Sequence, residues 1–382
     1  MIKIVIGFLA LAALTASAES PYAQWSNGPD KSDDYFPIAV WLQQPRHAQE
    51  YKALGINLYV GLWSGPNESQ LAELEKAQMP VICNQRLQFK DRKIIVGWMH
   101  GDEPDNAQPL PRGQKGYGPP ITPEKIIADY QRIKANDPSR PVMLNLGQGV
   151  AYDNYIGRGV RRGKLEDYPE YLKGCDVVSF DIYPANHDRP EITGHLEYVP
   201  RGVVRLREWS TNQKVVWNCI ECTHIHGEGH KPTPGEVRSE VWMSIIHGSR
   251  GLIYFVHQFK PRSTDAALLA DPEMSKAVAQ VNAQVKSLAA VINSPADPSL
   301  ATVAGDNSSV PIHLTARHHG GDAYVFAAAM SNAPAGATFT LNGLNAGTVE
   351  VIGENRKIPL AGGKFQDHFD GYAVHLYKVA PR

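Results

Sequence analysis

Two stretches of the chain carry carboxylates at positions suited to acid–base chemistry. The first, GWMHGDEPD (residues 97–105), places Asp102 and Glu103 directly after a short apolar run and before Pro104. Because proline cannot donate to a sheet ladder and favours an extended residue before it, a strand should end here with Glu103 at its carboxyl end. The second, KVVWNCIECT, places Glu221 at the end of a later apolar run. Two carboxyl groups across one pocket are what acid-assisted glycoside cleavage requires.

The elements that must position these carboxylates alternate regularly up to residue 293. Apolar runs that predict strands are mostly followed by helical patterns. Parallel neighbours need a crossover and eight strands close a sheet, so this order predicts a (β/α)8 TIM barrel. An open doubly wound sheet is the alternative, and the missing glycine fingerprint counts against its nucleotide-binding version. The predicted strands are 36–42, 56–63, 80–84, the run leading into Glu103, 141–147, 175–184, 214–223 and 251–259.

The pattern of apolar and turn-forming residues changes from residue 294 onward. Short alternating runs are separated by Gly, Asn and Asp turns, which predicts a small C-terminal antiparallel β-sandwich that packs against the barrel. The predicted runs are 311–315, 323–329, 338–341, 348–352 and 373–377.

Strand alternation gives the direction of the side chains around Glu221. If Glu221 faces the barrel axis, Cys219 and Trp217 face it too, while Ile220 and Asn218 point to the helices. A carboxylate on the inward side is costly to bury unless it has partners or a role in chemistry. The other interpretation is a structural ion pair or a surface-facing glutamate at the end of the strand.

At these positions the chain resembles the clan of retaining (β/α)8 glycoside hydrolases that includes β-galactosidase-like and cellulase-like barrels. That clan carries an acid/base glutamate after the fourth strand and a nucleophile glutamate after the seventh, where Glu103 and Glu221 stand. Tyr183, in SFDIYP, matches a tyrosine that hydrogen-bonds the nucleophile. The resemblance implies double displacement with retention, carboxyl groups about 5 to 5.5 Å apart, a carbohydrate substrate and no cofactor. It assigns no numbered family.

Two positions depart from the pattern of the clan. Asparagine usually precedes the acid/base, whereas this chain has Asp102, which accepts a hydrogen bond but cannot donate one when ionised. A second carboxylate beside Glu103 favours keeping one of the two protonated, so Asp102 as the acid with Glu103 as the binder stays an alternative. The eighth strand ends in Tyr254, Phe255 and His257 in place of the usual tryptophan platform.

Further side chains at strand ends are predicted to line the pocket. Aromatic faces there can stack on sugar rings, although a tryptophan low in a strand belongs to the core. The predicted substrate-binding residues are Asp102, Tyr183, Trp41, Trp63, Asn84, His100, Asn145, His224 and His257. The long Pro- and Gly-rich segment 106–121 is predicted to be a wall or lid of the pocket.

Two other classes of function compete with this interpretation. HIHGEGH, directly after the seventh strand, offers His224, His226 and His230 to a metal-dependent hydrolase. A polar loop lining the pocket is the plainer account, because no partner cluster of His and Asp appears at other strand ends, and we predict no metal. A barrel that only binds glycan is the third class, and intact glutamates at both positions argue against it.

Composition narrows the classes of partner and ligand. Lys and Arg number 38 against 39 Asp and Glu, which leaves no basic field for nucleic acid or an anionic membrane and suits a neutral substrate. The four cysteines lie in apolar strand-like contexts, which favours buried free thiols. One Cys-x-x-Cys without a second pair does not make a structural zinc site.

The amino terminus has the pattern of a secretory signal. Lys3 precedes an apolar run (residues 4–14) and small residues at 16–18, with the cut predicted before Glu19. The run is too short to span a bilayer comfortably, so we expect a secreted or periplasmic protein without membrane insertion after cleavage. The predicted parts are the signal peptide (1–18), the catalytic barrel (19–293) and the C-terminal sandwich (294–382).

Overall fold

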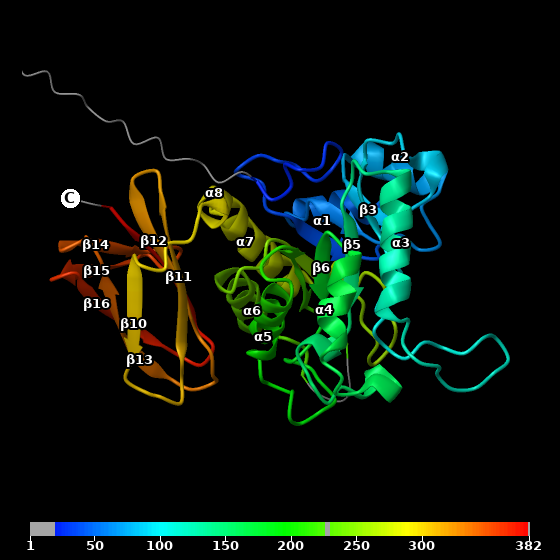
Figure 1. The fold of residues 1–382 in the computed structure, drawn as a ribbon. Helices are drawn as coiled ribbons and strands as arrows, with labels where there is room; N and C mark the ends of the chain where they lie inside the picture. Colours follow the sequence, from blue (N-terminus) through cyan, green and yellow to red (C-terminus); the bar gives the residue numbers. More distant parts are fainter. Residues whose placement is uncertain (1–19, 226–229, 381–382) are drawn as a thin grey trace, which may run out of the picture.

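Nine parallel strands form the first sheet of the computed structural model, which describes residues 20–225 and 230–380 (Figure 1). The predicted signal peptide lies outside the described residues. The strands are β1 (Ile38–Trp41), β2 (Leu58–Val60), β3 (Val81–Asn84), β4 (Ile95–Met99), β5 (Val142–Leu146), β6 (Val177–Phe180), β7 (Val215–Val216), β8 (Asn218–Glu221) and β9 (Leu252–Phe255).

This sheet closes into the predicted (β/α)8 barrel. Strands β7 and β8 are two parts of one extended segment, separated only by Trp217. Its first part pairs with β6 and its second part with β9, and β9 in turn pairs with β1. The segment therefore joins the two ends of the sheet and acts as the seventh of eight barrel strands, and β9 is the eighth.

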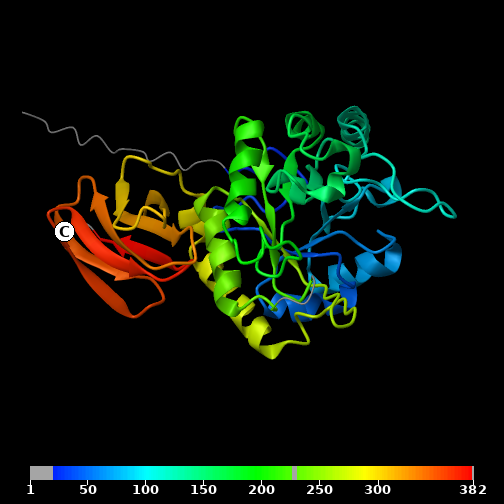
Figure 2. The same cartoon turned by 90° about the horizontal axis from the view of Figure 1, so that it is seen from below.

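Helices cover the outside of the barrel (Figure 2). They begin where the sequence supplies caps: the side chain of Asn67 accepts from the backbone N–H of Gln70, and that of Thr233 accepts from the backbone N–H of Glu236. Only a short 3-10 turn, Leu87–Phe89, connects β3 to β4. The helices are α1 (Ala48–Ala53), α2 (Glu68–Ala77), α3 (Pro123–Asn136), α4 (Asp167–Tyr171), α5 (Tyr198–Trp209), α6 (Pro234–Ile246), α7 (Pro272–Ser287) and α8 (Ala289–Asn293).

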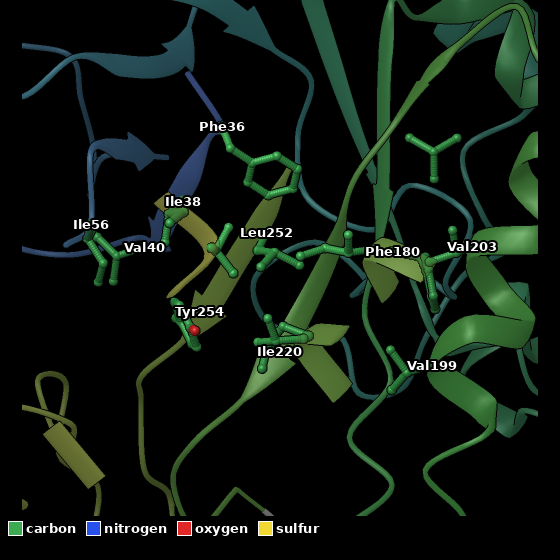
Figure 3. Close-up of a cluster of buried hydrophobic side chains, with 14 of the residues drawn as sticks. Phe36, Ile38, Val40, Ile56, Phe180, Val199, Val203, Ile220, Leu252 and Tyr254 are labelled. Carbon is green, nitrogen blue, oxygen red and sulfur yellow. The ribbon is translucent and has the colours of Figure 1, made fainter. Parts of the chain in front are cut away.

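Two separate hydrophobic clusters show which way the strand residues point. The larger cluster lies between strands and helices and includes Ile220 and Leu252 (Figure 3). The smaller one fills the barrel and includes Trp217 and Cys219. The alternation predicted for the seventh strand is therefore correct from residue 217 to residue 220. All four cysteines are buried and free, as predicted.

The C-terminal part is an antiparallel sheet of eight strands in the order β10-β13-β16-β15-β14-β17-β12-β11. The sequence predicted five of them and missed β10, β15 and β16. The strands are β10 (Ala301–Gly305), β11 (Ile312–His319), β12 (Asp322–Ala329), β13 (Ala335–Leu341), β14 (Ala346–Val351), β15 (Arg356–Ala361), β16 (Lys364–Phe369) and β17 (Val374–Val379).

Helix α6 is the main contact between the barrel and this β domain. Ser239 donates to the carbonyl of Tyr372 at 2.7 Å, and the ring of Trp242 lies edge-on to Phe326 at 5.3 Å between centroids. The prediction that the second domain packs against the barrel is confirmed. No helix within the described residues is both long and apolar enough to cross a bilayer.

Candidate active site

A cluster of carboxylates lies at the carboxyl ends of β4 and β6. Asp102 and Glu103 follow β4, and Asp181 follows β6 directly. Glu103 has φ of +42°, a backbone conformation that a non-glycine residue adopts at some energetic cost and that is concentrated at functional sites. Its N–H donates to the carbonyl of Asn145 at 3.2 Å, which holds this turn to the end of β5.

The side chains of Glu103 and Asp181 are hydrogen-bonded to each other. Burial, and then the charge of Asp181, raise the pKa of Glu103 well above its ordinary value. Burial also raises the pKa of Asp181, to about 7, while its hydrogen bonds with Glu103 and Tyr183 oppose that rise. The two carboxyl groups therefore share a proton near neutrality, as in other carboxyl pairs that cannot both ionise. Both residues remain partly exposed to solvent.

Asn145 and Tyr183 each hydrogen-bond one carboxyl group of the cluster, Asn145 that of Asp102 and Tyr183 that of Asp181. The Asn145 amide donates to Asp102 at 2.9 Å, and its oxygen accepts from Ser179 at 2.6 Å. Burial raises the pKa of Asp102 to about 6, and the Asn145 hydrogen bond counteracts this rise. The hydroxyl of Tyr183 hydrogen-bonds Asp181. The resemblance implied that Tyr183 hydrogen-bonds Glu221. In the structure the carboxylate that Tyr183 contacts is Asp181.

A buried acid, Asp105, anchors the turn that carries Glu103. It accepts from the N–H of Gly147 at 2.9 Å and from the hydroxyl of Tyr168 at 3.2 Å, and it lies 3.7 Å from the guanidinium of Arg158. Gly147 also matters sterically, since a Cβ there would lie 2.9 Å from Oε1 of Glu103. The Glu103 carboxyl therefore rests against the start of the loop after β5.

Glu221 does not lie on the barrel axis, where alternation placed it. Its side chain is 0% exposed. It accepts from the backbone N–H groups of Ala185 at 2.6 Å and of Asn186 at 3.2 Å, and it is hydrogen-bonded to Glu240 of α6. Burial raises the pKa of Glu221 to about 8 and that of Glu240 well above its ordinary value. Glu221 thus lies between α6 and the turn after β6, with no surface open to a sugar in this structure.

The predicted sugar-contact residues divide into exposed and enclosed ones. Trp63 is 44% exposed and stands edge-on to His257 at 6.1 Å between ring centroids, and Asn84 is exposed at the end of β3. Trp41 and His257 are buried near the mouth, where the ring of His257 lies 3.3 Å from the carbonyl of Trp41.

His100 is directed away from the pocket, contrary to prediction. Its ring hydrogen-bonds the carbonyl of Gly174 at 2.8 Å, and only 4% of the residue is exposed. Burial lowers its pKa. Because Gly174 precedes β6 at the amino-terminal side of the sheet, His100 has a structural contact where the sequence suggested a substrate contact.

The histidine-rich loop is described only in part. His226 lies outside the described residues. Among the described residues, Nε2 of His224 is buried without a hydrogen-bond partner, and His230 is paired with Glu236 at 3.1 Å. Within residues 20–225 and 230–380 there is no group of three or more His, Cys, Asp or Glu arranged to hold a metal ion.

Residues 106–121 do not close over the carboxylates as a lid. Pro109 and Tyr117 pair across this segment, and Tyr117 is 76% exposed. Figure 1 shows the segment projecting from the barrel on the side of α3. It forms an arm beside the site, and its start contacts the turn of Glu103 through Gln108, whose amide donates to the Glu103 carbonyl at 3.2 Å. Of the two predicted roles, wall or lid, the segment does not take that of a lid.

Comparisons with known proteins show the fold. The chain matches no protein-family model and no curated protein sequence. Many solved structures resemble it, and three of those that share its architecture, a (β/α)8 barrel followed by a β domain, serve as examples. They are an exo-carrageenase from Bacteroides ovatus (10% identity, 95% of this chain and 86% of that chain, TM-score 0.58), an α-amylase from Geobacillus thermoleovorans (9%, 92% and 100%, 0.55) and α-galactosidase I from Mortierella vinacea (11%, 93% and 99%, 0.54).

Proposed function

We propose that this chain is a glycoside hydrolase that cleaves an O-glycosidic bond in an oligo- or polysaccharide, with Glu103 as the general acid. The observation that carries the proposal is the hydrogen-bonded pair of Glu103 and Asp181 at the carboxyl end of the barrel. A carboxyl group kept protonated near neutrality is what protonation of a leaving oxygen needs. The carrageenase, amylase and galactosidase names of similarly folded proteins support a carbohydrate substrate.

Asp181 is the second carboxylate that the geometry favours. Glu103 protonates the glycosidic oxygen as the bond to the anomeric carbon breaks, and the ionised Asp181 forms a covalent bond to that carbon. Water then enters, Glu103 takes its proton, and the Asp181 ester is hydrolysed with net retention. A sugar entering between the two must separate carboxyls that are now in contact. The retaining separation, about 5 to 5.5 Å, needs less movement than the inverting one, roughly 6.5 to 9.5 Å.

The resemblance to retaining glycosidases assigns the nucleophile to Glu221. That assignment requires the Glu221 carboxylate to leave the N–H groups of Ala185 and Asn186 and to reach the mouth of the barrel. Asp181 already lies beside Glu103 at the carboxyl end of the barrel, with its Oδ1 buried.

Three variants tested on a panel of polysaccharides and aryl glycosides discriminate between these assignments. Glu103→Gln and Asp181→Asn are expected to lower kcat/KM at least about 100-fold, while Glu221→Gln keeps activity within roughly tenfold of wild type. Loss with Glu221→Gln and retained activity with Asp181→Asn would return the nucleophile to Glu221. Loss of turnover on chelation, with active Glu103→Gln, would point to a metal-dependent hydrolase. Glycan affinity in the wild type without turnover would make this a binding barrel.

Export is a further part of the proposal, carried by the signal pattern at residues 1–18. Expression of the full chain in a Gram-negative host should release a processed form that begins at Glu19 into the periplasm or medium. Recovery of unprocessed chain from the cytoplasm alone would contradict export, and it would leave the assignment of the carboxylates untouched.

A further inference from the structure

A cavity of about 350 Å³ lies at the end of the barrel opposite the carboxylate cluster. Its walls come from the amino-terminal segment at Pro21 and Gln24, from the segments that lead into β7 and β9, and from β11 of the β domain. None of its fourteen lining residues is acidic, and four are cationic: Arg207, Lys214, Arg250 and Arg317.

Among the described residues, the three arginines of this cavity have no carboxylate partner. Within the described parts of the chain, no Asp or Glu oxygen lies within 4.0 Å of their guanidinium groups, and their hydrogen bonds go only to neutral oxygens. Each guanidinium carries five N–H donors, so most of these donors have no protein acceptor. The bonds are Arg207 to the carbonyl of His247 (2.8 Å), Arg250 to the carbonyl of Ile292 (3.0 Å), and Arg317 to the carbonyl of Ser294 (3.1 Å) and the hydroxyl of Thr315 (3.2 Å).

The other buried arginines of the described residues are neutralised. Arg140 lies 2.6 Å from Asp137, and Arg158 lies 2.6 Å from Asp167. Arg317 is comparably buried, at 4% exposure, without such a partner. Burial, and then the charges of Arg250 and Arg207, lower the pKa of Arg317 to about 10. A buried charge without a partner is unfavourable, so a bound anion would stabilise this cluster of arginines.

We propose that this cavity binds an oxyanion of the phosphate or sulfate type, either free or carried as an ester by a small molecule. Planar guanidinium groups bind such groups through paired, charge-assisted hydrogen bonds. Because Arg207 and Arg250 belong to the barrel and Arg317 to the β domain, the bound anion joins the two domains. The site lies apart from the carboxylates, and its function does not depend on the glycosidase proposal.

Isothermal titration of the full chain with inorganic phosphate tests the site directly. The wild type should take up one phosphate per chain in a saturable manner, and Arg317→Gln and Arg207→Gln should each weaken the affinity at least about tenfold. Arg112→Gln, on the exposed arm 106–121, is the matched control and should bind as the wild type does. Arg207 is only partly buried, so its variant keeps the test usable if Arg317→Gln fails to fold.

Thermal unfolding provides the second readout and separates the sources of the anion. Phosphate should raise the Tm of the wild type and of Arg112→Gln, compared with chloride at equal ionic strength, and should raise it less in the two cavity variants. A hexose phosphate that binds about tenfold tighter than inorganic phosphate identifies a carried group, and equal affinity identifies the free ion. The proposal is overturned if the wild type binds neither ligand at roughly 10 mM, a weak affinity by any measure.

Discussion

The carboxyl group of Glu103 shares a hydrogen bond with that of Asp181, which joins the end of β4 to the end of β6. The bond makes the two residues one titrating unit, whose apparent pKa values belong to the pair. Burial raises the pKa of both carboxyl groups, and the charge of Asp181 adds to the rise for Glu103.

Activity is expected to follow a bell-shaped dependence on pH, and Tyr183→Phe should move its acidic limb. The Tyr183 hydroxyl donates to Asp181 and so favours the ionised carboxylate. Its removal raises the pKa of Asp181, which means that a higher pH is needed to ionise the group. We expect the acidic limb of kcat/KM to shift upward by roughly one pH unit.

Tyr254→Phe is the control for this measurement. The Tyr254 hydroxyl is also buried, but it donates to Asn282 at 2.8 Å on the helix side of the barrel. That variant should lose some stability and keep the pH profile of the wild type. An acidic limb that moves in both variants, or in neither, would contradict the role given to Tyr183.

Gly147→Ala should lower activity with little loss of stability. The new methyl group would lie 2.7 Å from the Asn106 amide and 2.9 Å from Oε1 of Glu103, both ends of side chains that can shift. A displacement of about 1 Å in a catalytic group can cost about 100-fold in rate. Gly101→Ala is the matched control, since a Cβ there meets no atom within 4 Å. Equal activity of the two variants would show that the position of Glu103 is not critical.

Much of the architecture could be read from the sequence because the barrel strands are buried on both faces. Such strands appear as continuous apolar runs, and all eight were predicted. The missed strands of the β domain, β10, β15 and β16, are largely exposed and carry Gly305, Arg356 and Asp367 where alternation would show a buried face. Pro359 within β15 also argues against a strand, and here it lies in a short strand beside β14 and β16.

The candidate site was predicted only in part, because its pairings are not local. Pro104 marks the end of β4, so Glu103 could be singled out. Asp181 also follows an apolar run, in SFDIYP, so the sequence did carry a signal for it. No proline stands next to Asp181 to mark the end of the strand, and the sequence interpretation singled out Tyr183 of the same stretch. Strand alternation could not reveal that N–H groups from the turn after β6, together with Glu240, surround Glu221.

Trp63→Ala should raise KM roughly tenfold and change kcat less. The Trp63 ring is 44% exposed at the mouth of the barrel, next to His257, and an aromatic face in that position suits stacking on a sugar. Tyr117→Ala removes a more exposed ring, 76% open, from the projecting arm and should leave KM unchanged. If both variants have the KM of the wild type, Trp63 does not contribute to substrate binding.

Glu240→Gln should flatten the dependence of stability on pH. The pKa values of Glu221 and Glu240 are raised in the folded chain, so the pair contributes stability that is present below the ordinary carboxyl pKa and is lost as pH rises through about 8. The amide of the variant donates to Glu221 at every pH and removes one titrating group. Between pH 5 and pH 9, the decrease in Tm should be larger for the wild type than for the variant, by roughly 3 °C or more.

Glu73→Gln, at an exposed position of α2, serves as control, and its Tm should follow that of the wild type. A Tm difference between wild type and Glu240→Gln that stays constant over this range would mean that the two glutamates do not share a proton.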